Sequence, residues 1–552
     1  MAHQRTLIVG GVAGGASCAA RLRRLDETAE IVVFERGADV SFANCGLPYY
    51  LGGAIAERRK LLVSTPERFR NIFNIDVRVR HEVRNIDRKN QQVEVVDLLT
   101  GKVGREPYDV LVLSTGATPV RPPLPGIDLP GIFTVRDLGD ADRIHDWIEQ
   151  RKPTRAVVVG GGYIGLEMVE NLARRGMGVT LIEMMGQVMP PMDAEMVTPV
   201  QRELSRQNVD LQLGHAVAAF EPAEEGAIAV VDRRGNRFVG DLVILAVGVR
   251  PDVRLAKDAG LAIGSTGGIR VDDQMRTSDP AIFAVGDAVE VPDFVTGLPA
   301  LMPLAGPANR QGRIAADAIR GRPSRYRGTQ GTAVVGVFDW TLAMTGATEK
   351  SLRRAGVPFE KSITHAFDHA SYYPGAERIH LKLLFAPDSG RLLGAQAVGR
   401  RGVEKRIDVI ALAIQKDATV FDLEEAELCY APQYGAAKDA VNMAGFVASN
   451  VLRGDVRLGH WSEWKRRNAE GNAPVTLDVR PATDVAAHAI PGTIRIPMGE
   501  LRARLDELPR DCEIWVHCNV GQNSYYAVRL LSQHGFRVRN LSGGITSYGL
   551  EP

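Results

Sequence analysis

A glycine-rich turn between a buried strand and a helix occurs twice in this chain of 552 residues. The second copy, Arg155–Gly165, reads RAVVVGGGYIG and places Gly160, Gly162 and Gly165 in strict G-x-G-x-x-G register. A predicted helix and the strand Val179–Glu183 follow, so an acid stands about 20 residues beyond the glycines. Glycines allow the backbone to approach a pyrophosphate at the start of the helix, and the acid binds ribose hydroxyls. The pattern therefore predicts a βαβ nucleotide-binding unit.

The first copy, near the N-terminus, is less regular. Residues Thr6–Gly15 read TLIVGGVAGG, and an alanine-rich helix and the strand Ile31–Phe34 follow before Glu35. A strict register from Gly10 would need glycine where Val12 stands, so a tight strand-to-helix turn without a ligand is the alternative. Two such units in one chain predict two bound nucleotides, most simply a flavin and a nicotinamide.

The acid of the second copy indicates which nicotinamide nucleotide binds. Glu183 favours the unphosphorylated ribose of NADH, because a carboxylate repels a 2′-phosphate. Its neighbours Met184 and Met185 supply no cation for that phosphate, so we expect NADH in preference to NADPH.

Three later segments lie where a protein that binds two nucleotides needs its chain to cross between the nucleotide-binding units. Leu111–Pro119 is a predicted strand that ends in small residues, and Leu242–Pro251 repeats its character. Ala281–Ala288 reads as a strand, a glycine and an aspartate that lead into a helix. Asp287 at that place can accept hydrogen bonds from the ribityl hydroxyls of a flavin, and its alternative role is a plain helix N-cap.

One cysteine stands alone in the segment Ser41–Tyr50, which reads SFANCGLPYY. Because no second cysteine lies in a C-x-x-C or C-x₄-C arrangement, Cys45 cannot form a local dithiol. It must therefore react with a small-molecule thiol or with oxygen, or be a buried structural cysteine. As a nucleophile it would act as a thiolate, for which we expect a lowered pKa.

Composition limits the setting in which this chemistry occurs. The 67 basic and 66 acidic residues nearly cancel, so we expect no nucleic acid and no membrane as partners. No run of about 18 apolar residues is present, and the N-terminal apolar stretch is too short for a signal peptide. An odd number of scattered cysteines suits a reducing compartment, so a cytoplasmic protein is expected. The five cysteines are Cys18, Cys45, Cys429, Cys512 and Cys518.

The composition changes after Asn450. Residues 451–473 show weak periodicity and are expected to be a linker, and a new small α/β unit follows. In this unit a strand, Glu513–Cys518, ends on a cysteine, and the next loop opens a helix. Backbone N–H groups and the helix N-terminus at such a loop lower a thiol pKa and hold an anionic persulfide.

Residues 1 to about 450 resemble the flavin-dependent pyridine nucleotide-disulfide oxidoreductases, and within them the single-cysteine branch of coenzyme A disulfide reductases. The motifs that carry this resemblance are GGVAGGASCAARLRRLD, SFANCGLPY, GGGYIGLEM, AVGDA, SYYPGA, KRIDV and YAPQYGAAKD. Residues from about 474 to 552 resemble a single rhodanese (sulfurtransferase) domain. The motifs there are LDVR, HAIPGTIRIP, the Cys518 loop and the closing LSGG.

The resemblance implies an α/β fold class: two Rossmann-like nucleotide-binding domains for FAD and NADH, an α+β dimerisation domain and a C-terminal α/β rhodanese domain. The implied boundaries are 1–150 with 251–327 for the FAD-binding domain, 151–250 for the NADH-binding domain, 328–450 for the dimerisation domain, 451–473 for the linker and 474–552 for the rhodanese-like domain.

The resemblance also implies site residues, and no metal. Cys45 and Cys518 are the expected nucleophiles, and Tyr430 and, second, Tyr373 are the expected acids or orienting groups, Tyr430 from across a homodimer. The other implied cofactor-binding residues are Gly10, Gly11, Ala13, Gly14, Glu35, Arg36, Asn44, Val83, Thr115, Gly116, Gly160, Gly162, Tyr163, Ile164, Gly165, Glu183, Gly248, Gly286, Asp287, Pro303, Leu304 and Ala305.

A coenzyme A site is implied as well, and its phosphates call for cations. The first helix supplies three cations, Arg21, Arg23 and Arg24, for which a solvated basic face is the alternative. Family positions that contact coenzyme A are occupied by Arg24, Ser41, Asn44, Asn309 and Lys438. A lysine of the family's phosphate clamp is replaced by Phe73, and Arg68 and Arg70 lie nearby as substitutes.

The fused rhodanese favours a sulfane-sulfur substrate. We expect FAD-dependent, NADH-driven reduction of a coenzyme A persulfide or polysulfide to thiol and hydrogen sulfide, with reduction of coenzyme A disulfide as the alternative. An NADH oxidase or peroxidase ranks third, because the histidine of those relatives is replaced by Ala13. A non-enzymatic redox sensor ranks last. The rhodanese loop has Asn523 where an arginine is usual, so a docking-only rhodanese is an alternative.

Overall fold

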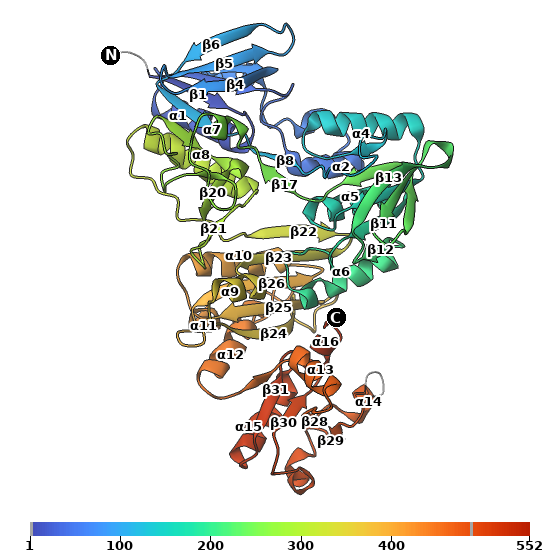
Figure 1. Cartoon of the computed structure of the whole chain (residues 1–552). Helices are drawn as coiled ribbons and strands as arrows, with labels where there is room; N and C mark the ends of the chain where they lie inside the picture. The colour runs from blue at the N-terminus through green and yellow to red at the C-terminus, as the bar shows by residue number, and fades with distance from the viewer. Residues whose placement is uncertain (1–3, 486–488, 552) are drawn as a thin grey trace. The chain divides into compact units, whose positions relative to one another are not determined.

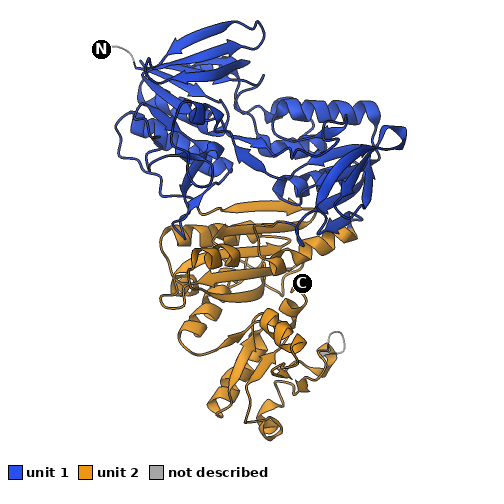
Figure 2. Ribbon diagram, viewed as in Figure 1, with its two compact units in different colours: residues 1–188, 207–329 blue, residues 189–206, 330–552 orange. Residues whose placement is uncertain are grey.

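The structure is a computed structural model that describes residues 4–485 and 489–551, so His488 of the HAIPGTIRIP motif lies outside the described residues. The chain divides into two compact units (Figure 2). Unit 1 comprises residues 1–188 and 207–329, and unit 2 comprises residues 189–206 and 330–552. Among the described helices, none combines the length and the apolar character needed to cross a membrane.

Unit 1 contains two five-stranded parallel sheets of the kind that the glycine turns predict. The first has the order β19-β7-β1-β2-β3, and helix α1 (Ala13–Leu25) follows β1 (Figure 1). The buried residues of α1 include Cys18, Ala19 and Leu22. The second has the order β12-β11-β10-β16-β9, with helix α5 (Tyr163–Arg174) after β10. The strands of the first sheet are β1 (Arg5–Val9), β2 (Glu30–Glu35), β3 (Asp76–Val79), β7 (Val110–Leu113) and β19 (Ile282–Ala284); those of the second are β9 (Ile132–Phe133), β10 (Arg155–Val159), β11 (Gly178–Glu183), β12 (Asp210–Leu213) and β16 (Leu242–Leu245).

The two glycine turns have the same backbone geometry. Gly10 and Gly160 adopt φ of +96° and +106°, and a Cβ on either would lie within 2.4 Å of a carbonyl oxygen at the end of a neighbouring strand. A Cβ on Gly15 would lie 1.9 Å from the Gly10 carbonyl oxygen, and Gly165 has the same relation to Gly160. The first turn therefore keeps the two glycines that close packing requires, although Val12 stands at the middle position of the motif.

The segment around Asp287 differs from the expected strand and helix. After β19, Gly286–Ala288 form one short 3₁₀ turn, and the strand β20 (Val289–Pro292) follows. The N-cap position of that turn is Val285, and no side chain caps it. Asp287 is therefore not a helix N-cap, because the turn is too short and begins one residue earlier.

Unit 2 contains an antiparallel sheet of order β22-β23-β26-β25-β24, with helices beside it. The strands are β22 (Ala333–Val337), β23 (Trp340–Gly346), β24 (Glu360–Phe367), β25 (Arg378–Phe385) and β26 (Leu392–Gly399), and the helices include α9 (Glu349–Ala355), α10 (Val403–Gln415) and α12 (Ala440–Leu452). Helix α12 begins at Ala440, because Asp439 caps it, and Asp439 also forms a buried ion pair with Arg406 at 2.7 Å.

A buried lysine holds helix α6 (Ala194–Arg206) to this sheet, although α6 lies within the segment expected to bind NADH. Lys382 on β25 is 0% exposed, and its Nζ lies 2.7 Å from Asp193 and 2.5 Å from Glu349 and also contacts Glu195. Burial would raise the pKa of Glu349, but the charges of Lys382 and Lys361 lower that pKa to about 2. Among the described residues, these three carboxylates are close enough to hold a metal ion, yet Lys382 already supplies the compensating charge.

The C-terminal part of unit 2 is a parallel α/β sheet of order β27-β31-β30-β28-β29. Its strands are β27 (Leu458–Gly459), β28 (Val475–Asp478), β29 (Ile494–Arg495), β30 (Ile514–His517) and β31 (Val538–Leu541), with helices α13 (Trp461–Ala469), α14 (Ala482–Val485), α15 (Gln522–Gln533) and α16 (Gly544–Tyr548).

The segment 451–473 differs from the linker that we expected. Strand β27 pairs with β31, and α13 buries Trp461 and Trp464, so much of this segment belongs to the C-terminal sheet. The indole N–H of Trp461 donates to the Gly544 carbonyl oxygen at 2.7 Å, and that of Trp464 donates to Thr476 Oγ1 at 2.9 Å. The buried residues of α13 are its two tryptophans, and the residues between and after them are mostly polar or charged, so the sequence pattern did not reveal a packed helix.

Replacing Lys382 by methionine should destabilise unit 2 strongly. The Lys382→Met variant keeps the length of the side chain but leaves three buried carboxylates without their cation, which costs about 3–5 kcal/mol. The measurement is the midpoint of thermal or denaturant unfolding of the full chain. As a control, Arg59→Met removes an ion pair whose arginine is 81% exposed. The free energy of unfolding of this variant should stay within about 0.5 kcal/mol of that of the parent. A Lys382→Met midpoint equal to that of the parent would contradict the prediction.

Candidate functional site

Cys45 lies on a short 3₁₀ turn, Asn44–Gly46, directly before helix α2 (Leu47–Leu51). Its side chain is exposed, so it is not a buried structural cysteine. A Cβ on Gly46 would lie 2.4 Å from the end of the Leu61 side chain, so Gly46 lets Leu61 pack closely against this turn. The Asn44 side-chain amide donates to the carbonyl oxygen of Arg136 at 2.9 Å and holds the turn in place.

The protein groups around Cys45 act against the lowered pKa that we expected for this thiol. Partial burial, followed by the charges of Glu167 and Asp287, raises the pKa of Cys45, and only a backbone hydrogen bond opposes them. The expectation is therefore not met by the protein groups alone, because the charges that act on Cys45 here belong to carboxylates and thiolate formation is disfavoured near them.

Glu167 and Tyr49 are two residues near Cys45 that the sequence analysis did not single out. The Tyr49 hydroxyl donates to Glu167 Oε1 at 3.2 Å. Burial raises the pKa of Glu167 to about 7, and burial with the Glu167 charge raises the pKa of Tyr49 to about 12. Glu167 can thus change protonation near neutral pH. The position of Glu167 in GGGYIGLEM, two residues after Gly165, and that of Tyr49, four residues after Cys45, were the available signals.

Each acid that was expected to bind a ribose lies beside its own glycine turn. The Gly11 N–H donates to Glu35 Oε2 at 2.9 Å, and the Gly161 N–H donates to Glu183 Oε2 at 2.7 Å. The two turns therefore present a carboxylate in the same way, which fits the role that the sequence predicts for both.

Arg136 is a further residue that the sequence analysis missed, and it joins three predicted cofactor positions. Its carbonyl oxygen accepts from Asn44, and its Nη1 lies 4.0 Å from Asp287. A Cβ on Gly116 would lie 2.6 Å from Arg136 Nη2, so the guanidinium covers that glycine. Burial raises the pKa of Asp287, and the charge of Arg136 opposes this shift. No regular spacing in the sequence marks this arginine.

Asp252 joins two more of the predicted residues. It lies just after β17 (Val249–Pro251), and its carbonyl oxygen accepts from Thr115 Oγ1 at 2.6 Å while its carboxylate lies 3.3 Å from Arg36. The other predicted cofactor residues, apart from Val83, lie at turns and helix starts. Ala13 and Gly14 begin α1, Gly162 caps α5, and Tyr163 and Ile164 begin it. Gly248 (φ +108°) precedes β17, Gly286 (φ +83°) follows β19, and Pro303, Leu304 and Ala305 lead into α8 (Ala305–Ile319). Val83 is buried on β4 (His81–Asp87).

The arginines of the first helix have three different environments. Arg21 is paired with Asp317 at 2.8 Å, Arg23 is buried against backbone carbonyls, and Arg24 is exposed. Arg24 is thus the one of the three best placed to meet a phosphate, and the charge of Arg21 is already balanced. Arg68 and Arg70 are both exposed on α3 (Pro66–Phe73).

Two other predicted coenzyme A residues have defined partners within unit 1. Ser17 Oγ donates to Asn309 Oδ1 at 2.6 Å, so α1 and α8 meet there. Ser41 has a left-handed φ of +50°, and its N–H donates to the Gly11 carbonyl oxygen at 2.9 Å. The Cys45 segment is therefore attached directly to the first glycine turn.

The predicted tyrosines of unit 2 are exposed. The hydroxyls of Tyr430 and Tyr372 are hydrogen-bonded at 2.8 Å, and their side chains are 49% and 74% exposed. Tyr373 packs edge-on against His369 at 5.8 Å between ring centroids. Tyr372, not Tyr373, is thus the direct partner of Tyr430. The predicted coenzyme A residue Lys438 also lies in unit 2, and its Nζ is 5.9 Å from the centroid of the Phe446 ring.

Cys518 lies at the end of β30, in a loop that leads into α15. The thiol is buried, and Ser524 Oγ donates to its sulfur at 3.4 Å. The Asn519 side-chain amide donates to Asp484 Oδ2 at 2.8 Å, so a carboxylate stands beside the loop. Asn523 lies in the first turn of α15.

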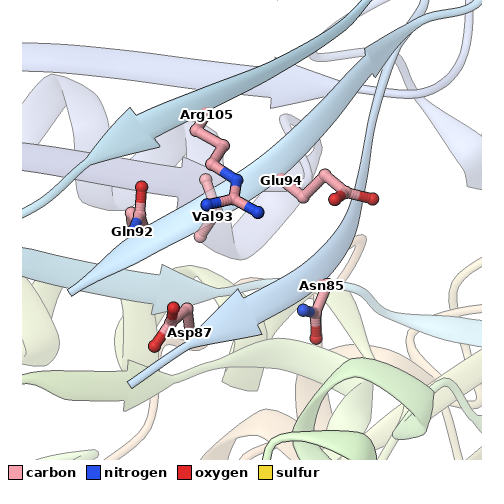
Figure 3. Close-up of a pocket in the computed structure, with 6 residues that line it drawn as sticks. All are labelled: Asn85, Asp87, Gln92, Val93, Glu94 and Arg105. Carbon is pink, nitrogen blue, oxygen red and sulfur yellow. The ribbon is translucent and has the colours of Figure 1, made fainter. Parts of the chain in front are cut away.

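A small hollow on the three-stranded sheet of unit 1 is lined by none of the predicted site residues (Figure 3). Its volume is about 40 Å³, far below the roughly 300 Å³ of a small-molecule pocket. It lies on β4, β5 (Gln92–Asp97) and β6 (Val103–Pro107) and is lined by Asn85, Asp87, Gln92, Val93, Glu94 and Arg105.

Three family models match the chain. The pyridine nucleotide-disulphide oxidoreductase model matches residues 4–312, its dimerisation-domain model matches residues 332–441, and the rhodanese-like domain model matches residues 462–551. These matches and the sheet topology confirm the predicted fold class. The rhodanese match begins inside the segment that we expected to be a linker.

Individual proteins resemble the chain over most of its length. The coenzyme A disulfide reductase of Staphylococcus epidermidis is 38% identical over 445 residues, 80% of this chain and 99% of that protein. The structure of reduced Bacillus anthracis CoADR-RHD has a TM-score of 0.97 at 48% identity and covers 100% of this chain and 98% of its own. A NAD-dependent persulfide reductase from A. fulgidus has a TM-score of 0.91 at 38% identity, covering 99% of this chain and 100% of its own.

Replacing Glu167 by glutamine should lower the pKa of Cys45. The substitution removes a charge that raises this pKa, so the inflection of Cys45 alkylation against pH should fall by about one unit. The measurement is the rate constant of iodoacetamide alkylation, read at the Cys45 peptide by mass spectrometry. Glu149→Gln, on helix α4 (Leu138–Arg151), removes an exposed carboxylate paired with Arg175 and should leave the inflection in place. An unchanged or higher inflection in Glu167→Gln would show that this carboxylate does not act on Cys45.

Proposed function

Because the chain belongs to the pyridine nucleotide-disulphide oxidoreductases, we propose that it oxidises NADH through FAD and reduces a coenzyme A persulfide or polysulfide at Cys45. The products are coenzyme A thiol and hydrogen sulfide. The observation that carries the proposal is the exposed, solitary Cys45 of a chain whose rhodanese-like domain also bears a cysteine in its loop. The likeness over nearly the whole chain to CoADR-RHD and to a NAD-dependent persulfide reductase supports it.

The residues around the first glycine turn fit a flavin nucleotide. Gly10 has no Cβ at a position where a Cβ would clash with the end of a neighbouring strand. Glu35 accepts a hydrogen bond from Gly11, and Asp287 lies 4.0 Å from Arg136. We propose that Glu35 holds the ribose and Asp287 the ribityl chain, while Glu183 holds the ribose of NADH. When bound, FAD supplies the two-electron chemistry that joins nicotinamide oxidation to thiol reduction.

The reaction at Cys45 balances with one NADH and one proton. The Cys45 thiolate attacks one sulfur of the persulfide and expels either the coenzyme A thiolate or hydrosulfide, leaving a persulfide or a mixed disulfide on Cys45. Two electrons that originate in NADH then cleave this S–S bond and restore the thiolate. Glu167, with a pKa raised to about 7, is placed to exchange a proton near Cys45.

Coenzyme A is the proposed carrier of the substrate sulfur, and a homodimer is the proposed assembly. Arg24 and the α3 arginines offer exposed cations for its phosphates. The match to a dimerisation domain and the exposed Tyr372–Tyr430 pair support a dimer in which these hydroxyls serve Cys45 of the partner and protonate the departing thiolate.

The rhodanese-like domain is proposed to carry sulfane sulfur on Cys518 and to supply it for reduction. The loop lacks the usual arginine, because Asn523 takes that place, and Asp484 adds a negative charge beside Asn519. Both features disfavour a dianion such as thiosulfate and favour a thiol-bound sulfur donor.

Replacing Cys45 by serine should abolish the NADH-driven reaction. The Cys45→Ser variant lacks the nucleophile, so NADH consumption with coenzyme A persulfide should fall at least about 10³-fold. Steady-state NADH oxidation measures this loss. The control is Cys18→Ser, which changes a buried cysteine on α1 away from the Asn44–Gly46 turn in sequence, and this variant should retain activity. Persistent turnover in Cys45→Ser would remove the basis of the proposal.

The parent protein also decides between the substrates. We expect kcat/KM for coenzyme A persulfide to exceed that for coenzyme A disulfide. A clear preference for the disulfide would establish the alternative function, and hydrogen peroxide turnover at a comparable rate would indicate a peroxidase.

Restoring a cation to the rhodanese loop should improve the use of thiosulfate. The Asn523→Arg variant adds a positive charge in the first turn of α15, and kcat/KM for thiosulfate should rise about tenfold. Transfer of sulfur to cyanide measures it. Gln533→Arg, at the far end of the same helix, adds the same charge away from the loop and should have no effect. An equal response in the two variants would show that Asn523 does not limit anion binding.

A further inference from the structure

The short helix α16 contacts the backbone of the Cys518 loop directly. The Ile545 N–H donates to the Cys518 carbonyl oxygen at 2.8 Å. The Thr546 N–H and its hydroxyl both donate to the Asn519 carbonyl oxygen, at 3.0 and 2.9 Å. These bonds fix the peptide groups on which the proposed sulfur carrier Cys518 is mounted, so the position of α16 determines the geometry of the loop.

Helix α16 is in turn bonded to the antiparallel sheet of the dimerisation domain. His365 Nε2 on β24 lies 2.8 Å from Ser547 Oγ, and the Ile363 N–H of the same strand donates to Ser542 Oγ at 2.9 Å. All four residues are buried. Strand β24 is an edge strand, so these contacts satisfy polar groups that would otherwise be exposed or unpaired.

The closing LSGG motif marks the place where these contacts converge. A Cβ on Gly543 would lie 2.0 Å from Ser547 Oγ and 2.6 Å from His365 Nε2. A Cβ on Gly544 would lie 2.4 Å from the Cys518 carbonyl oxygen. The two glycines therefore admit the histidine on one side and the Cys518 loop on the other, which accounts for a motif that the proposed chemistry does not use.

A second histidine orients His365. His365 Nδ1 lies 2.7 Å from His380 Nδ1, and His380 is stacked on Trp340 at 6.5 Å between ring centroids. Burial lowers the pKa of His365 well below its usual value and that of His380 to about 4, so both rings are neutral at pH 7. A neutral ring has one N–H and one acceptor, so His365 can donate from one ring nitrogen and accept at the other in its contacts with His380 and Ser547.

Helix α6 holds the other end of α16. Thr198 Oγ1 donates to the Leu550 carbonyl oxygen at 2.7 Å, and the Arg202 guanidinium donates to the Gly549 carbonyl oxygen. The loop that bears Cys518 thus depends on side chains from outside the rhodanese-like domain.

We infer that His365 is a positioning residue for Cys518, acting through Ser547 and helix α16. The inference rests on the proposed sulfur-transfer role of Cys518 and extends it: the reductase part of the chain sets the conformation of the sulfurtransferase loop. Without the His365–Ser547 contact, α16 loses a buried hydrogen bond and the Cys518 and Asn519 peptides lose a fixed support.

The test uses the full-length protein with Ser547→Ala, His365→Asn and the double variant. The first readout is the pH profile of Cys518 alkylation by iodoacetamide, followed at its peptide by mass spectrometry, and the second is sulfur transfer to cyanide from coenzyme A persulfide, a thiol-bound donor. Each single variant should raise the rate of Cys518 alkylation, because this thiol is buried in the parent and a loosened loop exposes it, and should lower kcat of transfer about tenfold. The double variant should be no worse than the more affected single variant, because both act through one contact. NADH-driven reduction at Cys45 should stay within twofold of the parent.

Ser532→Ala, an exposed serine on α15, is the control and should match the parent in both readouts. A parent-like alkylation profile in His365→Asn would overturn the inference, even if Ser547→Ala failed to fold. Alkylation needs no sulfur donor. A parent chain that transfers no sulfur would therefore refute the proposed rhodanese activity, while the profile would still decide whether His365 positions Cys518.

Discussion

At Gly10 and Gly160 the backbone passes so close to a neighbouring strand end that no side chain can be accommodated. The rest of unit 1 depends on this close approach, because it sets where α1 and α5 begin and which backbone N–H groups are free to face a phosphate. The same approach places Glu35 and Glu183 beside their turns. The Cys45 segment joins the arrangement through Ser41, whose N–H donates to Gly11.

Carboxylates dominate the electrostatics near Cys45. Glu167 and Asp287 both act to raise the pKa of the thiol, and Glu167 itself has a pKa of about 7. A thiol in such surroundings needs another source of stabilisation for its thiolate, and the electron-poor ring of a bound flavin is the one that the proposed function provides. The environment of Cys45 therefore suits a site that becomes reactive only as a holoenzyme.

Local patterns in the sequence predicted the strands and helices around both glycine turns and the loop that bears Cys518. They failed where tertiary contacts decide the outcome. Trp461 and Trp464 bury a helix whose other residues are mostly charged, so 451–473 was expected to be a linker. Arg136 lies far from Asn44 and Asp287 in sequence, and Glu167 lies far from Tyr49, so no spacing rule connects these residues with their partners. The family resemblance supplied the coenzyme A positions and the cofactor positions outside the motifs of the two glycine turns and Asp287, which no periodicity could have identified.

The order of segments along the chain has one more consequence. Residues 189–206 belong to unit 2 although their flanking strands belong to unit 1, so the polypeptide passes between the units at 188, 206 and 329. No single cut can yield the two units as separate intact pieces. A fragment ending near residue 329 would retain Asp193 and Glu195 without Lys382, and a fragment starting there would retain Lys382 with Glu349 alone. The charge balance of that cluster therefore requires both segments of unit 2, 189–206 and 330–552, in one polypeptide.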